Sequence, residues 1–160
     1  MLMLSFQSGD SYYAISGDAV IEVVPSVKLF VLPTAPSQVV GLLNYGGGPL
    51  PVIDFSILME SRPSREALHT RIIILQGEVD EKPFMIGLRA EKVTEVFDGN
   101  LEDFQDKGIT NNKWPFLDGV MAKSNQVIQR IDAEKLFEWY SNVVQKGIES
   151  AMENIELWSH

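Results

Sequence analysis

Short runs in which apolar and polar residues alternate occupy most of the first 131 positions. Residues 2–7 and 11–15 read as two strands on either side of a turn at 7–10. Further short apolar runs, each bounded by glycine, proline or other turn residues, occupy 19–24, 39–43, 50–53, 84–88, 93–96 and 127–131. This pattern predicts many short strands joined by tight turns, which is typical of a β-barrel or a β-sandwich.

Other segments depart from this alternation. Residues 71–75 form a continuous β-branched run, which predicts a strand that is buried on both faces. Residues 28–32 are expected to form a further strand, and 55–59 a single helical turn before Pro63. The polar stretch 61–69 is expected to be an exposed connection, and 98–114 a long loop.

The last segment is helical in pattern. Residues 132–158 contain no proline, and Asp132 stands where a helix N-cap is expected. Apolar residues recur there at steps of three and four: Phe137, Tyr140, Val144, Ile148, Ala151, Ile155 and Trp158. An unbroken helix would be roughly 35–40 Å long. Its apolar stripe must pack on the same chain, on a second copy or on a partner, so a homo-oligomer through this helix is one expectation.

Composition narrows the functional classes. The 160 residues fit one domain, and 45% of them are hydrophobic. A formal charge of −9 argues against binding to nucleic acid or to an anionic membrane face. The chain has no cysteine, which excludes disulfides and thiol chemistry and suits a cytoplasmic protein. No signal peptide and no apolar run long enough to insert into a membrane is evident.

Catalytic or cofactor chemistry finds little support. The histidines, His69 and His160, are isolated, and no metal-ligand spacing or nucleophile elbow occurs. The glycine triplet 46–48 lacks the lysine and hydroxyl residue of a phosphate-binding loop and predicts a tight turn instead. Asp54 is expected to accept backbone N–H bonds after its strand rather than to accept a phosphoryl group. We therefore expect no catalytic, cofactor or metal residues.

The tryptophans could in principle form a stacking surface for a carbohydrate or a base. Trp114, Trp139 and Trp158 are scattered over a loop and a helix, which favours burial or interface packing.

The segment 32–54 carries a more specific signal. Proline and glycine break it into two short apolar runs joined by the glycine triplet, which predicts a β-hairpin. The segment resembles the signature of the CheW family, the small adaptors of bacterial chemotaxis signalling. The matching residues are Pro33, Ala35, Pro36, Val39, Gly41, Asn44, Gly47, Pro51, Val52 and Asp54. The family has an arginine in this signature, and Gly46 stands in its place.

Segments at 12–23, 87–96 and 116–137 resemble further parts of the same family, in the same order. The resemblance implies a mainly β fold, with two small five-stranded β-barrels in one compact unit, a groove between them and a C-terminal α-helix. It places a CheW-like domain at residues 1–140 and a C-terminal helical extension at 141–160.

The resemblance also implies a function without chemistry. Relatives of this family couple the regulatory domain of a CheA-type histidine kinase to the cytoplasmic tip of a methyl-accepting chemoreceptor. The positions that match partner-binding positions of the family are Val20, Glu22, Gly41, Leu42, Asn44, Gly46, Gly87 and Val96. For the glycines among them, close packing of neighbouring strands is an equally complete explanation. For Glu22, an ordinary solvent-facing strand residue remains the alternative.

Two other functions stay open at this point. Because glycine replaces the arginine at position 46, the chain could be a diverged scaffold for another pathway, such as type IV pilus or twitching motility, with altered or lost kinase coupling. A small-ligand-binding β-barrel is the third hypothesis.

Overall fold

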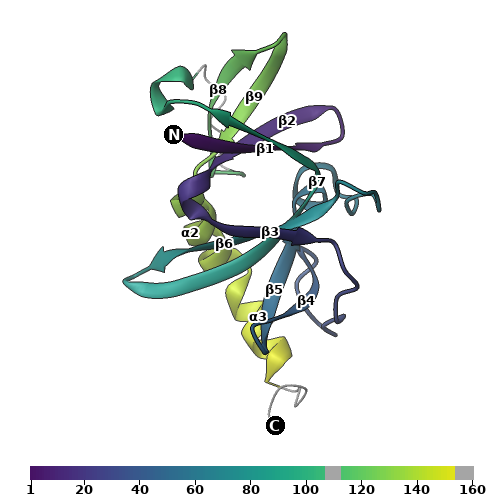
Figure 1. Ribbon diagram of the computed structural model, residues 1–160. Helices are drawn as coiled ribbons and strands as arrows, with labels where there is room; N and C mark the ends of the chain where they lie inside the picture. The colour runs from purple at the N-terminus through teal and green to yellow at the C-terminus, as the bar shows by residue number, and fades with distance from the viewer. Residues whose placement is uncertain (107–112, 154–160) are drawn as a thin grey trace.

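Strands dominate the computed structural model, which describes residues 1–106 and 113–153 (Figure 1). The strands are β1 (Leu2–Ser8), β2 (Ser11–Ser16), β3 (Val20–Pro25), β4 (Val39–Tyr45), β5 (Gly48–Asp54), β6 (Arg71–Val79), β7 (Lys82–Asp98), β8 (Leu117–Lys123) and β9 (Gln126–Ile131). The helices are α1 (Phe55–Glu60), α2 (Ala133–Val143) and α3 (Gln145–Met152), with short 3-10 turns η1 (Gly17–Ala19) and η2 (Leu101–Asp103). The predicted mainly β fold with helical structure near the C-terminus is confirmed.

One long strand joins two sheets. The first half of β7 pairs with β6 on one side and with β5 on the other, and its second half pairs with β1. The first sheet therefore runs β4–β5–β7–β6–β3, and the second runs β7–β1–β2–β9–β8. Each sheet has five strands, as the family resemblance implied.

The sheets do not close into barrels, which corrects the expected architecture. Among the described residues, β3 does not pair with β4, and β7 does not pair with β8. At each seam a connecting segment occupies the strand edge instead: Phe30 forms a bridge with Leu42, and Gln105 forms one with Val120. These bridges occupy backbone N–H and C=O groups of the edge strands. The two edge strands of each sheet would need these groups to pair with each other and close the sheet into a barrel.

Over the described residues, three clusters of apolar side chains form the core. The largest lies between the two sheets and includes Ile73 and Leu75 of β6 together with side chains from α1, α2 and α3. A second cluster lies on the opposite face of the first sheet and includes Ile72 and Ile74. A third lies on the second sheet, around Phe97. The strand β6 is thus buried on both faces, as its sequence predicted, because its alternate side chains enter two different clusters.

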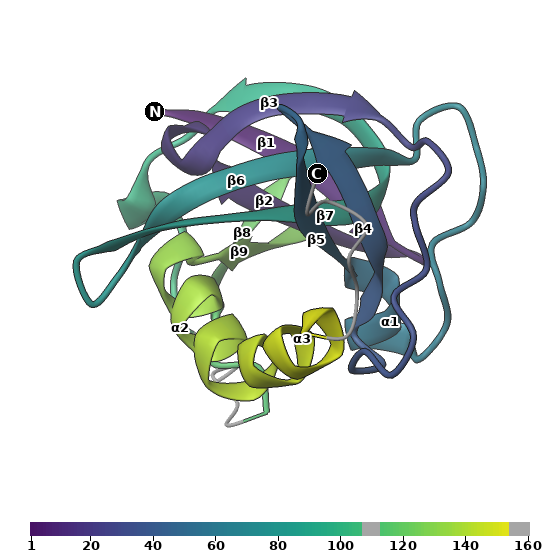
Figure 2. The ribbon, with the colours of Figure 1, turned by 90° about the horizontal axis from the view of Figure 1, so that it is seen from below.

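The C-terminal segment folds back on its own chain. All three helices lie on one side of the strands (Figure 2). Asp132 caps α2, as predicted, and a break at Val144 separates α2 from α3. The side chains of Val144, Ile148 and Ala151 are buried in the cluster between the sheets. The expected continuous helix is therefore two helices over the described residues.

The last residues of the predicted stripe, Ile155 and Trp158, lie outside the described residues. Of the helices that the described part of the chain contains, none has the length and apolarity needed to cross a membrane.

The connecting segments show one wrong prediction. Residues 28–32 do not form a strand, since only Phe30 makes a bridge. The helical turn expected at 55–59 is α1, and most of the connection at 61–69 is exposed, as predicted. The loop predicted at 98–114 contains η2, and its residues 107–112 lie outside the described part.

Candidate protein-interaction surfaces

Glu22 and Tyr45 meet across the open seam between β3 and β4. Glu22 is exposed, and the bulge between Val20 and Glu22 interrupts the pairing of β3 with β6. Desolvation raises the pKa of the Tyr45 phenol, and a hydrogen bond between this side chain and Glu22 raises it further. Val20 itself is half-buried and packs against the central cluster. The carboxylate of Glu22 is thus oriented by a neighbour and accessible to a partner.

The turn between β4 and β5 is built by glycine. Tyr45 pairs with Gly48, and the two residues between them, Gly46 and Gly47, have φ angles of 60° and 84°. Positive φ at both central positions is characteristic of a type I′ hairpin turn. A Cβ atom at either residue would have no neighbour within 4 Å. Gly46 is thus explained by backbone conformation and not by lack of space, while Asn44 beside it is exposed.

Three of the expected partner-binding residues are buried in the structure. Leu42 lies in the largest apolar cluster, between the two sheets. A Cβ on Gly41 would lie 2.7 Å from the carbonyl oxygen of Phe30, and one on Gly87 would lie 3.0 Å from side-chain atoms of β5 and β6. These contacts support close packing as the explanation for Gly41, Leu42 and Gly87, because all three positions are buried.

Val96 lies on the second sheet, away from the others. Its side chain is 61% exposed in the second half of β7, where it is paired with Leu4 of β1. Leu2, two residues earlier on β1, is exposed to a similar extent. The expected site residues therefore divide into exposed Glu22 and half-buried Val20 on β3, a hairpin tip, a buried group and a separate position on the second sheet.

A buried carboxylate organises the end of β5. The side chain of Asp54 accepts hydrogen bonds from the backbone N–H groups of Ser56 and Ile57, at 2.9 and 3.2 Å, and thereby caps α1. This confirms the role predicted from the sequence. The same carboxylate accepts the backbone N–H and the hydroxyl of Ser64 and forms a 2.7 Å ion pair with Arg89. The sequence did not indicate the last two partners, because they lie 10 and 35 residues away.

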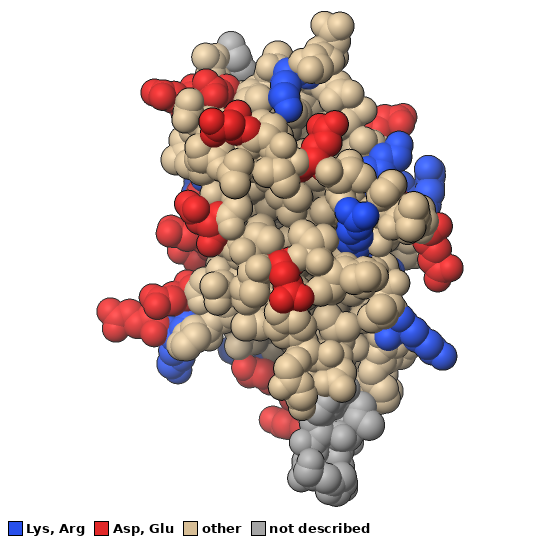
Figure 3. Space-filling view, viewed as in Figure 1, with Lys and Arg blue, Asp and Glu red and all other residues tan. Residues whose placement is uncertain are grey.

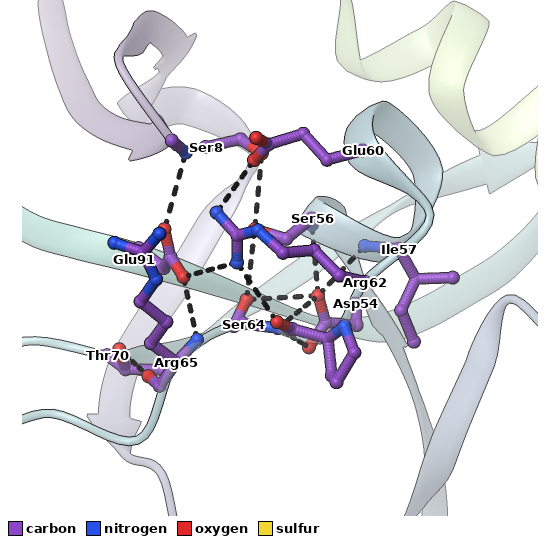
Figure 4. Close-up of polar contacts among 12 residues, drawn as sticks. Ser8, Asp54, Ser56, Ile57, Glu60, Arg62, Ser64, Arg65, Thr70 and Glu91 are labelled. Carbon is purple, nitrogen blue, oxygen red and sulfur yellow. Dashed lines mark hydrogen bonds and ion pairs between the residues drawn. The ribbon is translucent and has the colours of Figure 1, made fainter.

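A second carboxylate extends this network toward the other sheet (Figure 4). Glu91 of β7 accepts the backbone N–H of Arg65 at 2.6 Å and that of Gly9, in the turn between β1 and β2, at 3.4 Å. It also pairs with Arg62, which contacts Glu60 as well. Burial favours the neutral form of Glu91, but these hydrogen bonds outweigh it, so the pKa of the carboxyl is lowered.

Charge is unevenly distributed over the surface. In the view of Figure 3, most acidic side chains lie on one flank and most basic ones on the other. A hollow of about 670 Å³ lies between the two sheets beside α2. Its acidic lining residues are Asp18, Glu78, Glu81, Asp132, Glu134 and Glu138. Of the described residues that line it, Arg130 alone is basic, and it pairs with Asp118 at 2.7 Å.

The aromatic residues in the described part of the chain have packing roles. Trp139 is buried, and Trp114 and Phe116 make edge-to-face contacts with it, with ring centroids 5.8 and 5.4 Å away. Trp158 lies outside the described residues. His69 is exposed beside Arg71. Within residues 1–106 and 113–153, no group of three or more His, Cys, Asp or Glu side chains has metal-binding geometry.

Two open five-stranded sheets that share the long strand β7, with helices packed beside them, define a mainly β domain. The model of the CheW-like domain family matches residues 2–141, and the chain therefore belongs to this family. The match ends within α2, so α3 lies beyond it.

Two curated proteins and a solved structure are similar to the chain. Chemotaxis protein CheW of Rhizobium meliloti (strain 1021) is 24% identical over 84% of this chain and 86% of its own length. Probable chemotaxis protein CheW of Rhizobium etli is 23% identical over the same shares. The crystal structure of scaffolding protein TtCheW from Thermoanaerobacter tengcongensis has a TM-score of 0.70 and 23% identity, and covers 81% of this chain and 82% of that one. The last likeness shows a common fold.

Proposed function

We propose that this chain is a non-enzymatic adaptor of bacterial chemotaxis. In this role it couples the regulatory domain of a CheA-type histidine kinase to the cytoplasmic tip of a methyl-accepting chemoreceptor. The observation that carries the proposal is the family match over residues 2–141. The names of the two curated relatives support the chemotaxis assignment. Such an adaptor acts in the cytoplasm and needs only surfaces that bind two partners at once.

The exposed residues among the family-matched positions are the proposed contacts. Glu22, Asn44, Gly46 and Val96 reach solvent, and Val20 does so in part. Gly41, Leu42 and Gly87 contribute by shaping the strands that carry these residues, because their positions are packed. In this proposal residues 1–140 carry the adaptor function, and residues 141–160 are an extension to it.

A binding experiment tests the role of Glu22. We expect Glu22→Ala to weaken binding to a kinase regulatory domain or to a receptor cytoplasmic fragment by about fivefold or more, because it removes the charged group of a contact. Titration calorimetry with each purified partner measures the effect. Glu102→Ala, at an exposed acidic residue of η2, is the matched control and should bind as the unmodified chain does. Failure of the unmodified chain to bind either partner would overturn the proposed function.

A second function rests on one specific observation. Glycine at position 46 supplies neither the charge nor the five N–H donors of the family's arginine. A scaffold of another motility pathway, such as type IV pilus function, would bind a kinase domain encoded with that pathway and not the chemotaxis kinase. The same titrations, repeated with both kinase domains, separate the two functions.

A further inference from the structure

The loop between α1 and β6, residues 61–70, is held firmly although most of it is exposed. The backbone N–H of Ser64 donates to buried Asp54 at 3.0 Å, and that of Arg65 donates to Glu91 at 2.6 Å. The hydroxyl of Thr70 donates to the carbonyl of Arg65 at 2.6 Å. The backbone N–H of Val93 donates to the carbonyl of His69 at 2.9 Å. The first half of the loop is therefore tied to the buried carboxylates, and its far end is tied to the backbone of Arg65 and of β7.

The tip of this loop carries an unusual side chain. Leu68 is 84% exposed, the highest value among the large hydrophobic residues of the described part. No contact among the described residues covers this leucine, although it stands at the tip of a loop that is ordered by several hydrogen bonds. A fixed apolar side chain binds a partner with a small loss of conformational entropy.

The loop tip forms a ridge between two hollows. Ala67 lines both of them. The larger hollow, of about 590 Å³, has a mixed lining whose apolar part includes Val27, Leu29 and Val40, at the opposite end of β4 from the Gly46–Gly47 turn. The smaller, of about 370 Å³, is lined by Leu68 and by residues of the β1–β2 turn. Leu68 thus belongs to a continuous surface, made of the loop tip and the two hollows beside it, and is not an isolated exposed residue.

Positive charge surrounds this ridge on a chain whose net charge is −9. Lys28, Arg65, Arg71 and Lys92 border it, and none of them forms an ion pair within the described residues. The acidic side chains that line the same hollows without an ion pair there are Asp10 and Glu66. The connection that follows α1 lies on the flank where most basic side chains are seen in Figure 3. The surface is therefore apolar at its centre and mainly basic at its border.

We infer that the loop 61–70 is a docking surface for a globular protein domain that offers an apolar pocket bordered by carboxylates. The charge of such a partner complements the basic border, and the projecting Leu68 fits a concave apolar pocket. This inference rests on the proposed function for the identity of the partner: the globular partner there is the kinase regulatory domain, and the receptor tip is the helical one. The kinase regulatory domain is thereby assigned to the end of the first sheet where the loop 61–70 lies.

Binding of the kinase regulatory domain to two loop variants tests the inference. Leu68→Ala should weaken binding by about tenfold, as is usual for a central apolar anchor. Arg65→Glu should also weaken it, and the loss should shrink as salt is raised, because it arises from charge. Both side chains are exposed, so the melting temperature should not change. Leu101→Ala and Lys82→Glu, at exposed positions elsewhere, are the matched controls and should bind normally.

The outcomes separate this inference from the proposed function. If the unmodified chain does not bind the kinase domain, the proposed function fails. If it binds and both loop variants bind equally well, the inference about the loop is wrong and the proposed function stands. If the loop variants lose binding to a receptor fragment and keep binding to the kinase domain, the surface exists but its assigned occupant is wrong.

Discussion

At the scale of single residues, the glycine triplet shows whether backbone conformation or lack of room for a side chain requires glycine at a position. Gly46, Gly47 and Gly48 are all open to an added Cβ, but only the first two have positive φ. Gly46→Arg, which restores the family's residue, should therefore cost about 1–2 kcal/mol of folding free energy, the penalty for a side chain in the left-handed region. Gly48→Ala should be neutral or stabilise by up to about 1 kcal/mol, since its φ is not strained.

Urea unfolding of the two variants measures this difference. Equal stability of Gly46→Arg and the unmodified chain would show that the turn tolerates a side chain. In that case the absence of arginine here would need a functional explanation, and kinase binding by the variant would become the informative measurement.

At the scale of elements, the features that were predicted correctly from the sequence are those that depend on neighbouring residues in the chain. The alternating runs, the doubly buried strand β6 and the caps at Asp54 and Asp132 follow from residue type and local pattern and are confirmed. The strand predicted at 28–32 is wrong. This segment pairs with β4 through the isolated bridge between Phe30 and Leu42 and not through a regular ladder of hydrogen bonds. The network around Asp54 and Glu91 could not be predicted, since folding brings its members together from distant positions.

The junction of α2 and α3 offers a matched pair of valines for a test of packing. Val144 is fully buried between the sheets, whereas its neighbour Val143 is 54% exposed. Val144→Ala should cost roughly 1.5–3 kcal/mol, because two methyl groups leave a packed site. Val143→Ala should change stability by less than about 0.5 kcal/mol. Thermal unfolding of both variants measures the contrast, and equal effects would show that α3 does not brace the sheets.

Self-association through the C-terminal helix remains a prediction. Burial of Val144, Ile148 and Ala151 within the chain removes part of the apolar stripe that suggested it. Light scattering on the same variants reports the molar mass. A dimer that dissociates when Val143 is replaced would place the exposed side of α2 in the contact.

At the scale of the whole molecule, the carboxylate network links the two sheets. Glu91 belongs to the shared strand β7, and its partners come from the β1–β2 turn of one sheet and from the loop before β6 of the other. A fault in this network should affect the connection between the sheets and the position of the loop tip together. Stability and kinase binding should therefore respond to the same substitution.

This link makes stability depend on pH in a defined direction. Hydrogen bonds to Glu91 lower the pKa of its carboxyl in the folded chain, although burial opposes them. Below the unfolded pKa of about 4.3, the unfolded chain therefore binds more protons at this residue than the folded chain does. The contribution of Glu91 is complete above that value and is lost as the pH falls through the lower folded pKa.

Denaturant unfolding from about pH 7 to about pH 3 tests this, because the loss must follow protonation of the carboxyl. Glu91→Gln should cost roughly 1–3 kcal/mol at neutral pH, since it leaves buried donors poorly paired. The difference in stability between the unmodified chain and this variant should shrink steadily in acid. Glu66→Gln, at an exposed carboxylate of the same loop, is the control and should follow the unmodified chain at every pH. A difference for Glu91→Gln that stays constant across the range would mean that packing of the side chain, and not its charge, holds the loop to the sheets.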